Sequence, residues 1–406
     1  YAFERDSTGE LLRLGDVIRL AKNNSGSGMN KRNFTLLGDP ALRLAYPWHG
    51  RVVTDSINGV SITSFTDTLK AVSVVTVSGH IEDNKGNYLN DFNGLIFPVV
   101  FDKSRKIKTL ANDGGQPMEF YVQNSIVFSG KTKVNNGRFR FSFIVPRDID
   151  YSFGNGKISY YTKDDKTDMN GAFSNFIIGG FSSLARIDTT GPEIRLFLND
   201  TLFRNGDISD SNPVLLAKIS DLSGINTTGA GIGHDITAWL DEERNSSFSL
   251  NNYFETDMDN YTRGTVKYWL NNISEGVHTL SLKAWDNFNN SAVATLKFIV
   301  KSEGKFIIND VSNYPNPVTS YTYFTAGHNR TDKDLYIIIE IFDMSGRKVK
   351  ILEENLTSTG YRLPPIYWDG TIEGGKKAGR GIYAYVVTIK TGDGETARAS
   401  GRLIIL

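Results

Sequence analysis

The chain has 406 residues, with 45 basic and 45 acidic side chains and no cysteine. At roughly 100–200 residues per domain, this length predicts two to four domains. The balanced charge argues against a global attraction to nucleic acid. The absence of cysteine excludes a thiolate nucleophile, a thiolate metal site and a disulfide within this sequence. No apolar run approaches the ~20 residues that a membrane helix needs.

One amphipathic helix is predicted near the N-terminus, over Glu10 to Asn23. Its apolar residues recur at spacings of three and four, which places them on one face: Leu11, Leu14, Val17, Ile18 and Ala21. Together with the segment Asn33–Leu44, this helix holds too little apolar mass for a core of its own. We therefore expect residues 1–47 to be the end of a larger domain, and the chain to be the C-terminal part of a longer protein.

From Arg51 onward the hydrophobic period changes to two, as in half-buried strands. Val74–Ile81 alternates, turns at Asp83–Gly86 and returns through Leu95–Phe101, which predicts a hairpin. We predict a β-sandwich over residues 48–185. A breaker cluster, Thr189-Thr-Gly-Pro192, then marks a boundary.

Six short apolar stretches follow, and they predict an immunoglobulin-like sandwich over residues 186–303 without the cysteine pair of that class. The contact between its sheets is expected to rest on Trp239, Trp269 and Trp285. A third sandwich is predicted over residues 304–406, with hairpins around Asp343–Gly346 and Thr391–Gly394. The expected fold class is therefore mainly β, with tandem β-sandwich domains after a short α segment.

Catalytic motifs are absent from the sequence. No Gly-x-Ser-x-Gly elbow occurs. The run Gly374–Gly381 has the glycine spacing of a phosphate loop but carries Arg380 and Gly381 where such a loop needs Lys and Ser/Thr. Gly229–Gly233 has glycines like those of a dinucleotide-binding motif, but His234 follows and the motif is incomplete. The His234 side chain is expected to donate a hydrogen bond to a backbone carbonyl. No catalytic residue and no cofactor are predicted.

A calcium site is one hypothesis for the loops of the second sandwich. The side chains of Asp221, Asp235 and Asp286 supply the hard oxygen ligands that Ca²⁺ prefers, without the spacing of an EF-hand. The alternative is that these aspartates cap turns through Asx hydrogen bonds.

Several segments together resemble known families. Asn33–Leu44 resembles the end of a gingipain-type, caspase-like cysteine peptidase domain. Other segments are similar to the β region of the type IX secretion sortases of Bacteroidetes and to the C-terminal domain that marks cargo for that system, namely Asp221–Asp235, Leu280–Asn290, Tyr314-Pro-Asn-Pro317, Ile341–Arg347 and Gly379–Tyr385.

This resemblance implies a surface-exposed parent enzyme that removes C-terminal signal domains from exported cargo. The catalytic Cys and His of the family have no counterpart here, so the chain is expected to be non-catalytic. The implied partners are an outer-membrane β-barrel of the secretion system and, through the parent peptidase, cargo C-terminal signal domains. The implied location is the outer-membrane surface, reached through the periplasm.

The docking candidates in the last sandwich are Lys376, Lys377, Arg380, Tyr383 and Tyr385, which would lie beside an edge strand open to β-augmentation. The alternative for the three cations is a solvated turn. A rival function is a cell-surface adhesin or glycan-binding β-sandwich array, with sugars stacked on exposed rings. The candidate rings for that function are Tyr160, Tyr161, Tyr367 and Trp368.

Overall fold

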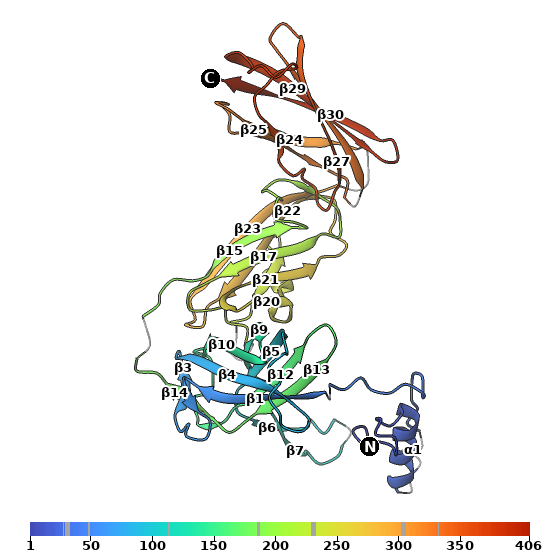
Figure 1. Cartoon of the computed structure of the whole chain (residues 1–406), viewed down its shortest axis with the longest axis vertical. Coiled ribbons are helices and arrows are strands. Elements are labelled where there is room, and N and C mark those ends of the chain that lie inside the picture. Colours follow the sequence, from blue (N-terminus) through green and yellow to red (C-terminus); the bar gives the residue numbers. More distant parts are fainter. Residues whose placement is uncertain are drawn as a thin grey trace.

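The computed structural model describes residues 1–406 except 27, 29–32, 48, 113, 185–186, 229–232, 302–305 and 332. The described chain is mainly β, with one short α-helix and two 3₁₀ turns, at Arg244–Ser246 and Asn251–Tyr253. Figure 1 shows three β units stacked along the long axis, with the helical N-terminal segment beside the first unit. The boundaries expected at 48, at 185/186 and at 303/304 lie at or beside residues outside this description. Among the described residues, no helix is long and apolar enough to cross a membrane.

The N-terminal segment, residues 1–47, contains helix α1, Leu14–Asn24. The helix begins four residues later than its sequence pattern predicts, because Leu11 and Arg13 form β-bridges with Arg5 and Arg43 and so keep the preceding backbone extended. No residue of α1 is buried. The apolar face that the pattern predicts is therefore present, but its side chains Leu14, Val17 and Ile18 are only partly buried.

The first β unit is a closed barrel and not the predicted sandwich. Its strands follow one another in the order β12-β13-β1-β4-β10-β9-β5, and β5 pairs again with β12. β12 is hydrogen-bonded on both sides, to β13 and, from Lys157↔Phe101 to Lys163↔Leu95, to β5. The barrel strands are β1 Gly50–Ile57, β4 Val74–Asp83, β5 Gly94–Phe101, β9 Thr132–Asn135, β10 Arg138–Ile144, β12 Lys157–Lys163 and β13 Asp168–Phe173.

Shorter strands surround this barrel. They are β2 Val60–Ser61, β3 Thr68–Ala71, β6 Arg105–Lys108, β7 Glu119–Val122, β8 Ile126–Ser129, β11 Gly154–Asn155 and β14 Ile177–Phe181. The barrel core is rich in aromatic rings, with Phe128 stacked on Phe143 at a centroid distance of 5.0 Å. Tyr160 is buried in the same core and its hydroxyl is 2.7 Å from Thr54 Oγ1. A buried Tyr160 offers no ring to a sugar.

The second β unit has two sheets that share one cluster of buried side chains. The strands are β15 Glu193–Leu198, β16 Ile208–Ser209, β17 Val214–Ser220, β18 Thr237–Leu240, β19 Phe248–Ser249, β20 Phe254–Asp257, β21 Asn260–Trp269, β22 Gly276–Trp285 and β23 Ser291–Val300. The contact between the sheets is mainly aliphatic, through side chains such as Leu198, Leu215 and Leu282. The prediction of a tryptophan contact is wrong for Trp269, which is 62% exposed because it lies at the end of β21 on the outward face that it shares with Lys267.

The third β unit also has two sheets over one buried cluster. Its strands are β24 Ile308–Tyr314, β25 Thr322–His328, β26 Asp334–Phe342, β27 Lys348–Thr357, β28 Ile366–Trp368, β29 Gly381–Thr391 and β30 Thr396–Ile405. Both predicted hairpins are present, as the antiparallel pairs β26/β27 and β29/β30. The end of β30 is covered, since Val318 N donates to Ile404 O and Leu406 N donates to Val318 O.

Candidate functional site

Three carboxylates meet at the end of the second β unit that faces the barrel. Asp188, Asp221 and Asp286 each place a carboxylate oxygen within 4.8 Å of the others. Two of them are predicted calcium ligands, whereas Asp235 is not in the group and accepts a hydrogen bond from Asn251 Nδ2 at 2.7 Å. Asp188 precedes the breaker cluster, and no spacing in the sequence ties it to the other two.

The electrostatics of this group favour a cation. Burial, together with the negative charges of Asp286 and Asp188, raises the pKa of Asp221 to about 6. Burial also raises the pKa of Asp286. A divalent cation would offset these repulsions, because hard cations accept clustered carboxylate oxygens. The calcium site therefore stays a prediction, now with Asp188 in place of Asp235.

The Asx alternative also has direct support. Asp286 Oδ1 accepts hydrogen bonds from the backbone N–H groups of Phe288 and Asn290, at 2.9 and 2.7 Å. Asp221 Oδ1 accepts one from Ser223 N at 2.7 Å. Asp286 Oδ2 also accepts a hydrogen bond from Asn290 Nδ2 at 2.8 Å, so these aspartates shape their own turns, as the turn hypothesis expects.

A second buried carboxylate joins the barrel to the second β unit. Asp148 follows β10 and accepts hydrogen bonds from Asn226 Nδ2 at 2.8 Å, Asn289 Nδ2 at 2.7 Å and His234 Nδ1 at 2.7 Å. The prediction that His234 binds a backbone carbonyl is wrong, because this carboxylate reaches it from the neighbouring unit. Its ring also lies against Trp285, with the centroids 4.3 Å apart. His234 is thus held as part of a junction.

A buried arginine side chain, that of Arg362, joins the third β unit to the second. Arg362 Nε and Nη2 donate to the two carboxylate oxygens of Asp207 at 3.0 and 2.6 Å, and Nη2 also donates to Asp310 at 2.5 Å. The neighbouring Tyr361 hydroxyl donates to Asp210. His328 is buried beside this network, and its burial lowers its pKa to about 4. Both junctions are therefore fixed by charged groups removed from water.

The predicted docking residues separate into two groups. Lys376, Lys377 and Arg380 are exposed in the turn before β29. Lys377 Nζ donates to Asp369 O at 2.6 Å, so it also holds that turn. Tyr383 and Tyr385 are buried in the third core, because the alternation of β29 points both of them inward. The prediction that these two tyrosines contact a partner is therefore wrong.

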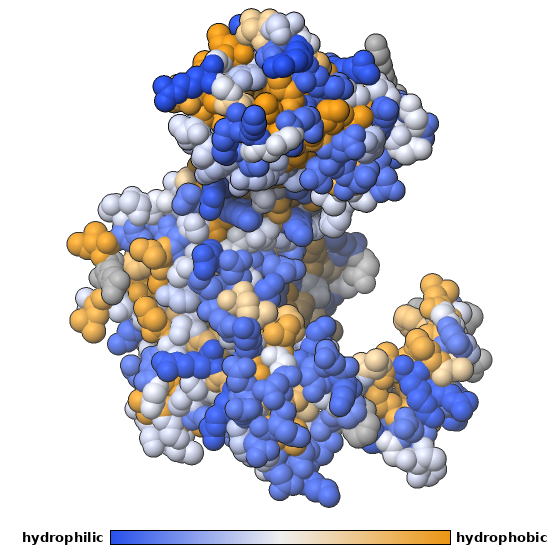
Figure 2. All heavy atoms as spheres, turned by 45° about the horizontal axis from the view of Figure 1, so that its top comes forward, coloured by the Kyte–Doolittle hydropathy of each residue, from blue (hydrophilic) through white to orange (hydrophobic). Residues whose placement is uncertain are grey.

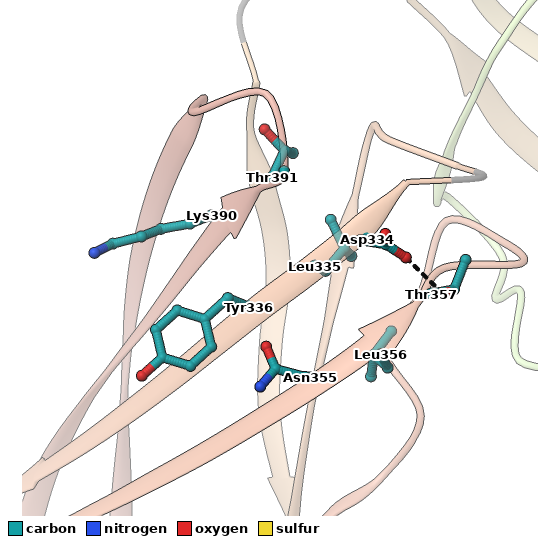
Figure 3. A pocket seen from close by; sticks show the side chains of 9 residues that line it. Asp334, Leu335, Tyr336, Asn355, Leu356, Thr357, Lys390 and Thr391 are labelled. Atoms are coloured by element: carbon teal, nitrogen blue, oxygen red, sulfur yellow. Dashed lines mark hydrogen bonds between the residues drawn. The ribbon is translucent and has the colours of Figure 1, made fainter.

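An open groove of about 530 Å³ crosses the β26–β27–β29 sheet of the third unit. Figure 3 shows its side chains, with Tyr336, Asn355 and Lys390 on neighbouring strands and a hydrogen bond from Thr357 Oγ1 to Asp334 at 2.7 Å. β27 lies at the edge of this sheet. The start of that edge is covered by Glu373, whose N–H donates to Val349 O at 2.8 Å. The later half of β27 borders the groove.

The chain was compared with protein families, with curated proteins and with solved structures. No protein-family model matches the chain, and no curated protein matches it. Among solved structures, it is similar to dimeric latent PorU from Porphyromonas gingivalis, with 32% identity over 100% of this chain and 39% of that chain, at a TM-score of 0.43. The chain thus spans 39% of the length of that protein.

Two adhesion proteins also match, each at a TM-score of 0.18. A tetra-tandem repeat from the extending region of a large adhesion protein has 13% identity, over 87% of this chain and 74% of that chain. A 1.5-MDa bacterial ice-binding adhesin has 10% identity, over 88% of this chain and 96% of that chain. Neither likeness is close enough to carry an argument about function.

Proposed function

We propose that the chain is the non-catalytic C-terminal region of a surface-exposed type IX secretion sortase related to PorU. Residues 1–47 would be the end of its gingipain-type peptidase domain, and residues 48–185 and 186–303 would be accessory β domains. Residues 304–406 would be the secretion-signal domain. The sequence motifs that resemble this family and the 32% identity along the whole chain support this division.

The observation that carries the proposal is the exposed apolar surface of the N-terminal segment. Helix α1 has an apolar stripe yet no buried residue. Its surroundings expose further large apolar side chains, namely Phe3, Phe34, Leu37, Leu42, Leu44 and Tyr46. Figure 2 shows the resulting hydrophobic surface on the small lobe at the right. A self-contained adhesin would bury such a face, whereas the last helix of a peptidase domain buries it against the rest of that domain.

The alternative function, a glycan-binding adhesin, loses two of its four candidate rings for sugar stacking, Trp368 and Tyr160. Trp368 is 1% exposed and its Nε1 donates to Thr371 O at 2.9 Å, so its ring belongs to the third core. Tyr160 is buried in the barrel. A flat open ring is needed for stacking on a sugar, and these two residues provide none.

In this proposal, the third β unit docks on the secretion partner during export. Its exposed cations Lys376, Lys377 and Arg380 lie in one turn, and its open edge is the later half of β27. Strand addition at such an edge would supply backbone hydrogen bonds to a partner, while the cations would set its orientation. The partner proposed is an outer-membrane β-barrel of the secretion system, which would hold the parent enzyme at the cell surface.

The experiment is a pull-down from solubilised outer membranes of the source organism, with the whole chain as bait. The proposal expects a type IX β-barrel protein, identified by mass spectrometry, with the wild-type chain. It expects loss of that protein with the triple variant Lys376→Glu, Lys377→Glu, Arg380→Glu. The matched control is Lys106→Glu, Lys108→Glu on the exposed strand β6, which should retain the partner. Equal recovery by both variants would contradict a role for Lys376, Lys377 and Arg380 in docking.

A further inference from the structure

The third β unit carries an exposed row of tyrosines that neither junction uses. In the β24-β25-β28 sheet, Tyr314 lies opposite Tyr323, and Tyr323 lies opposite Tyr367. These side chains are 81%, 40% and 54% exposed. Tyr321 extends the row, with its ring centroid 5.7 Å from that of Tyr323. Side chains alternate between the two faces of β25, so Tyr323 points outward while the next residue, Phe324, points into the core.

A groove of about 560 Å³ runs beside this row. The next residues on the same face, Ser312 and Thr325, pair directly across the strands and bring hydroxyl groups to its floor. Pro365 and, from the second β unit, Arg204 also line the groove. The volume lies in the range of ordinary small-molecule sites.

Arg204 gives the groove a positive charge. Its side chain is about half exposed, and Nη1 is 3.8 Å from Asp310 Oδ2, which is beyond hydrogen-bond distance. The same Asp310 oxygen accepts a hydrogen bond of 2.5 Å from Arg362. The stronger partner of Asp310 is therefore Arg362, and the Arg204 guanidinium keeps donors for a ligand. A guanidinium binds planar carboxylates through two parallel hydrogen bonds.

The chemistry of this face matches a saccharide better than an apolar protein surface. Tyrosine rings offer apolar faces to the C–H groups of a pyranose and hydroxyls to its polar rim. The groove adds hydroxyl and guanidinium groups, and none of the described residues that line it is Leu, Ile or Val. We propose that the row Tyr314–Tyr323–Tyr367 and Arg204 bind a carboxylate-bearing glycan, with sugar rings on the tyrosines and a carboxylate on the guanidinium. This inference goes beyond the secretion role and does not depend on it.

The test is calorimetric titration of the whole chain with the hexamer of galacturonic acid and with its methyl ester, which masks the carboxylates. Saturable binding of the acid is expected, and about tenfold weaker binding of the ester. Arg204→Gln should weaken binding of the acid to the level of the ester. The double variant Tyr314→Ala, Tyr367→Ala should weaken both sugars by about tenfold or more. Tyr121→Ala, at an exposed tyrosine on β7 of the first unit, is the matched control and should change neither affinity.

Several results would overturn the proposal. One is no saturable binding of the acid hexamer up to about 5 mM. Another is binding that the double tyrosine variant leaves unchanged. A third is binding of decaproline that this variant abolishes while the sugars do not bind, because the face would then be a peptide groove. Unchanged melting temperatures of the variants would show that a loss of binding is local, as the exposure of Tyr314 and Tyr367 leads us to expect.

Discussion

Arg362 of the third β unit holds Asp207 of the second through two hydrogen bonds, and its side chain is only 2% exposed. Arg362 Nη1 has no partner among the described residues, while Asp310 takes one more bond from Nη2. The pair therefore lies at a junction where water is largely excluded. Loss of one member would leave the other buried and uncompensated.

Replacing Arg362 with Ala is expected to cost about 3–5 kcal/mol at this junction, because the buried Asp207 would lose its cationic partner and keep only a backbone hydrogen bond from Arg204 N. The measurement is hydrogen exchange of the backbone amides in β16 and in residues 361–363. Arg204→Ala is the matched control, since it removes an exposed arginine that contacts the same Asp310, and it should cost less than about 1 kcal/mol. Equal effects of the two variants would contradict a special role for the buried pair.

Acid should weaken the third unit through His328. Its pKa is about 4 in the folded chain and about 6.5 in the unfolded chain, so the unfolded state binds the proton first as pH falls. Stability is therefore lost between pH 6.5 and 4, by about 3 kcal/mol in total. The check is the pH dependence of unfolding for wild type and His328→Leu. A wild-type curve that runs parallel to the variant over this range would refute the prediction.

Calcium should stabilise the second unit if the three carboxylates bind it. At a Ca²⁺ concentration about 100-fold above Kd, the expected gain is about 2–3 kcal/mol. Without Ca²⁺, Asp221→Asn should raise the melting temperature above pH 6, where the wild-type carboxylate is ionised against its neighbours. With Ca²⁺, the same variant should lose the response.

Asp235→Asn is the control for that experiment, because Asp235 lies outside the carboxylate group. It should keep the full response to Ca²⁺. A response that disappears in Asp235→Asn as well as in Asp221→Asn would favour the original ligand set, Asp221, Asp235 and Asp286, over the group Asp188, Asp221 and Asp286. A response that survives in Asp221→Asn would contradict both sets.

The junction at Asp148 should open when that carboxylate is removed. Asp148→Ala leaves the donors of Asn226, Asn289 and His234 without their acceptor, and a buried unsatisfied donor costs about 1–3 kcal/mol. The expected result is faster hydrogen exchange at residues 224–226 and 285–289. Lys131→Ala breaks an exposed ion pair with Glu255 at the same junction and should leave these rates nearly unchanged.

The mainly β character and the hairpins of the third unit could be predicted, because alternation and turn residues act locally. The closure of the barrel could not, since alternation in Lys157–Lys163 is the same whether the strand has one partner or two. The inward direction of Tyr383 and Tyr385 depends on where β29 begins, which the sequence does not state. Asp188 lies beside Asp221 and Asp286 because of the course of the segment that connects the first and second β units, which the sequence does not predict. The tyrosine row depends on the pairing of β25 with both β24 and β28, and β28 is distant from the other two in sequence.

The two junctions give the middle unit a direction. At one end the side chains of Asn226, His234 and Asn289 donate to one acidic side chain of the barrel, while Glu255 at the exposed margin pairs with Lys131. At the other end it presents acceptors, Asp207 and Asp210, and receives a basic side chain and a hydroxyl. An exchange of its neighbours would set carboxylate against carboxylate at one face and leave donors unmatched at the other. The order of the units along the chain is therefore encoded in the chemistry of the middle unit as well as in the covalent linkage.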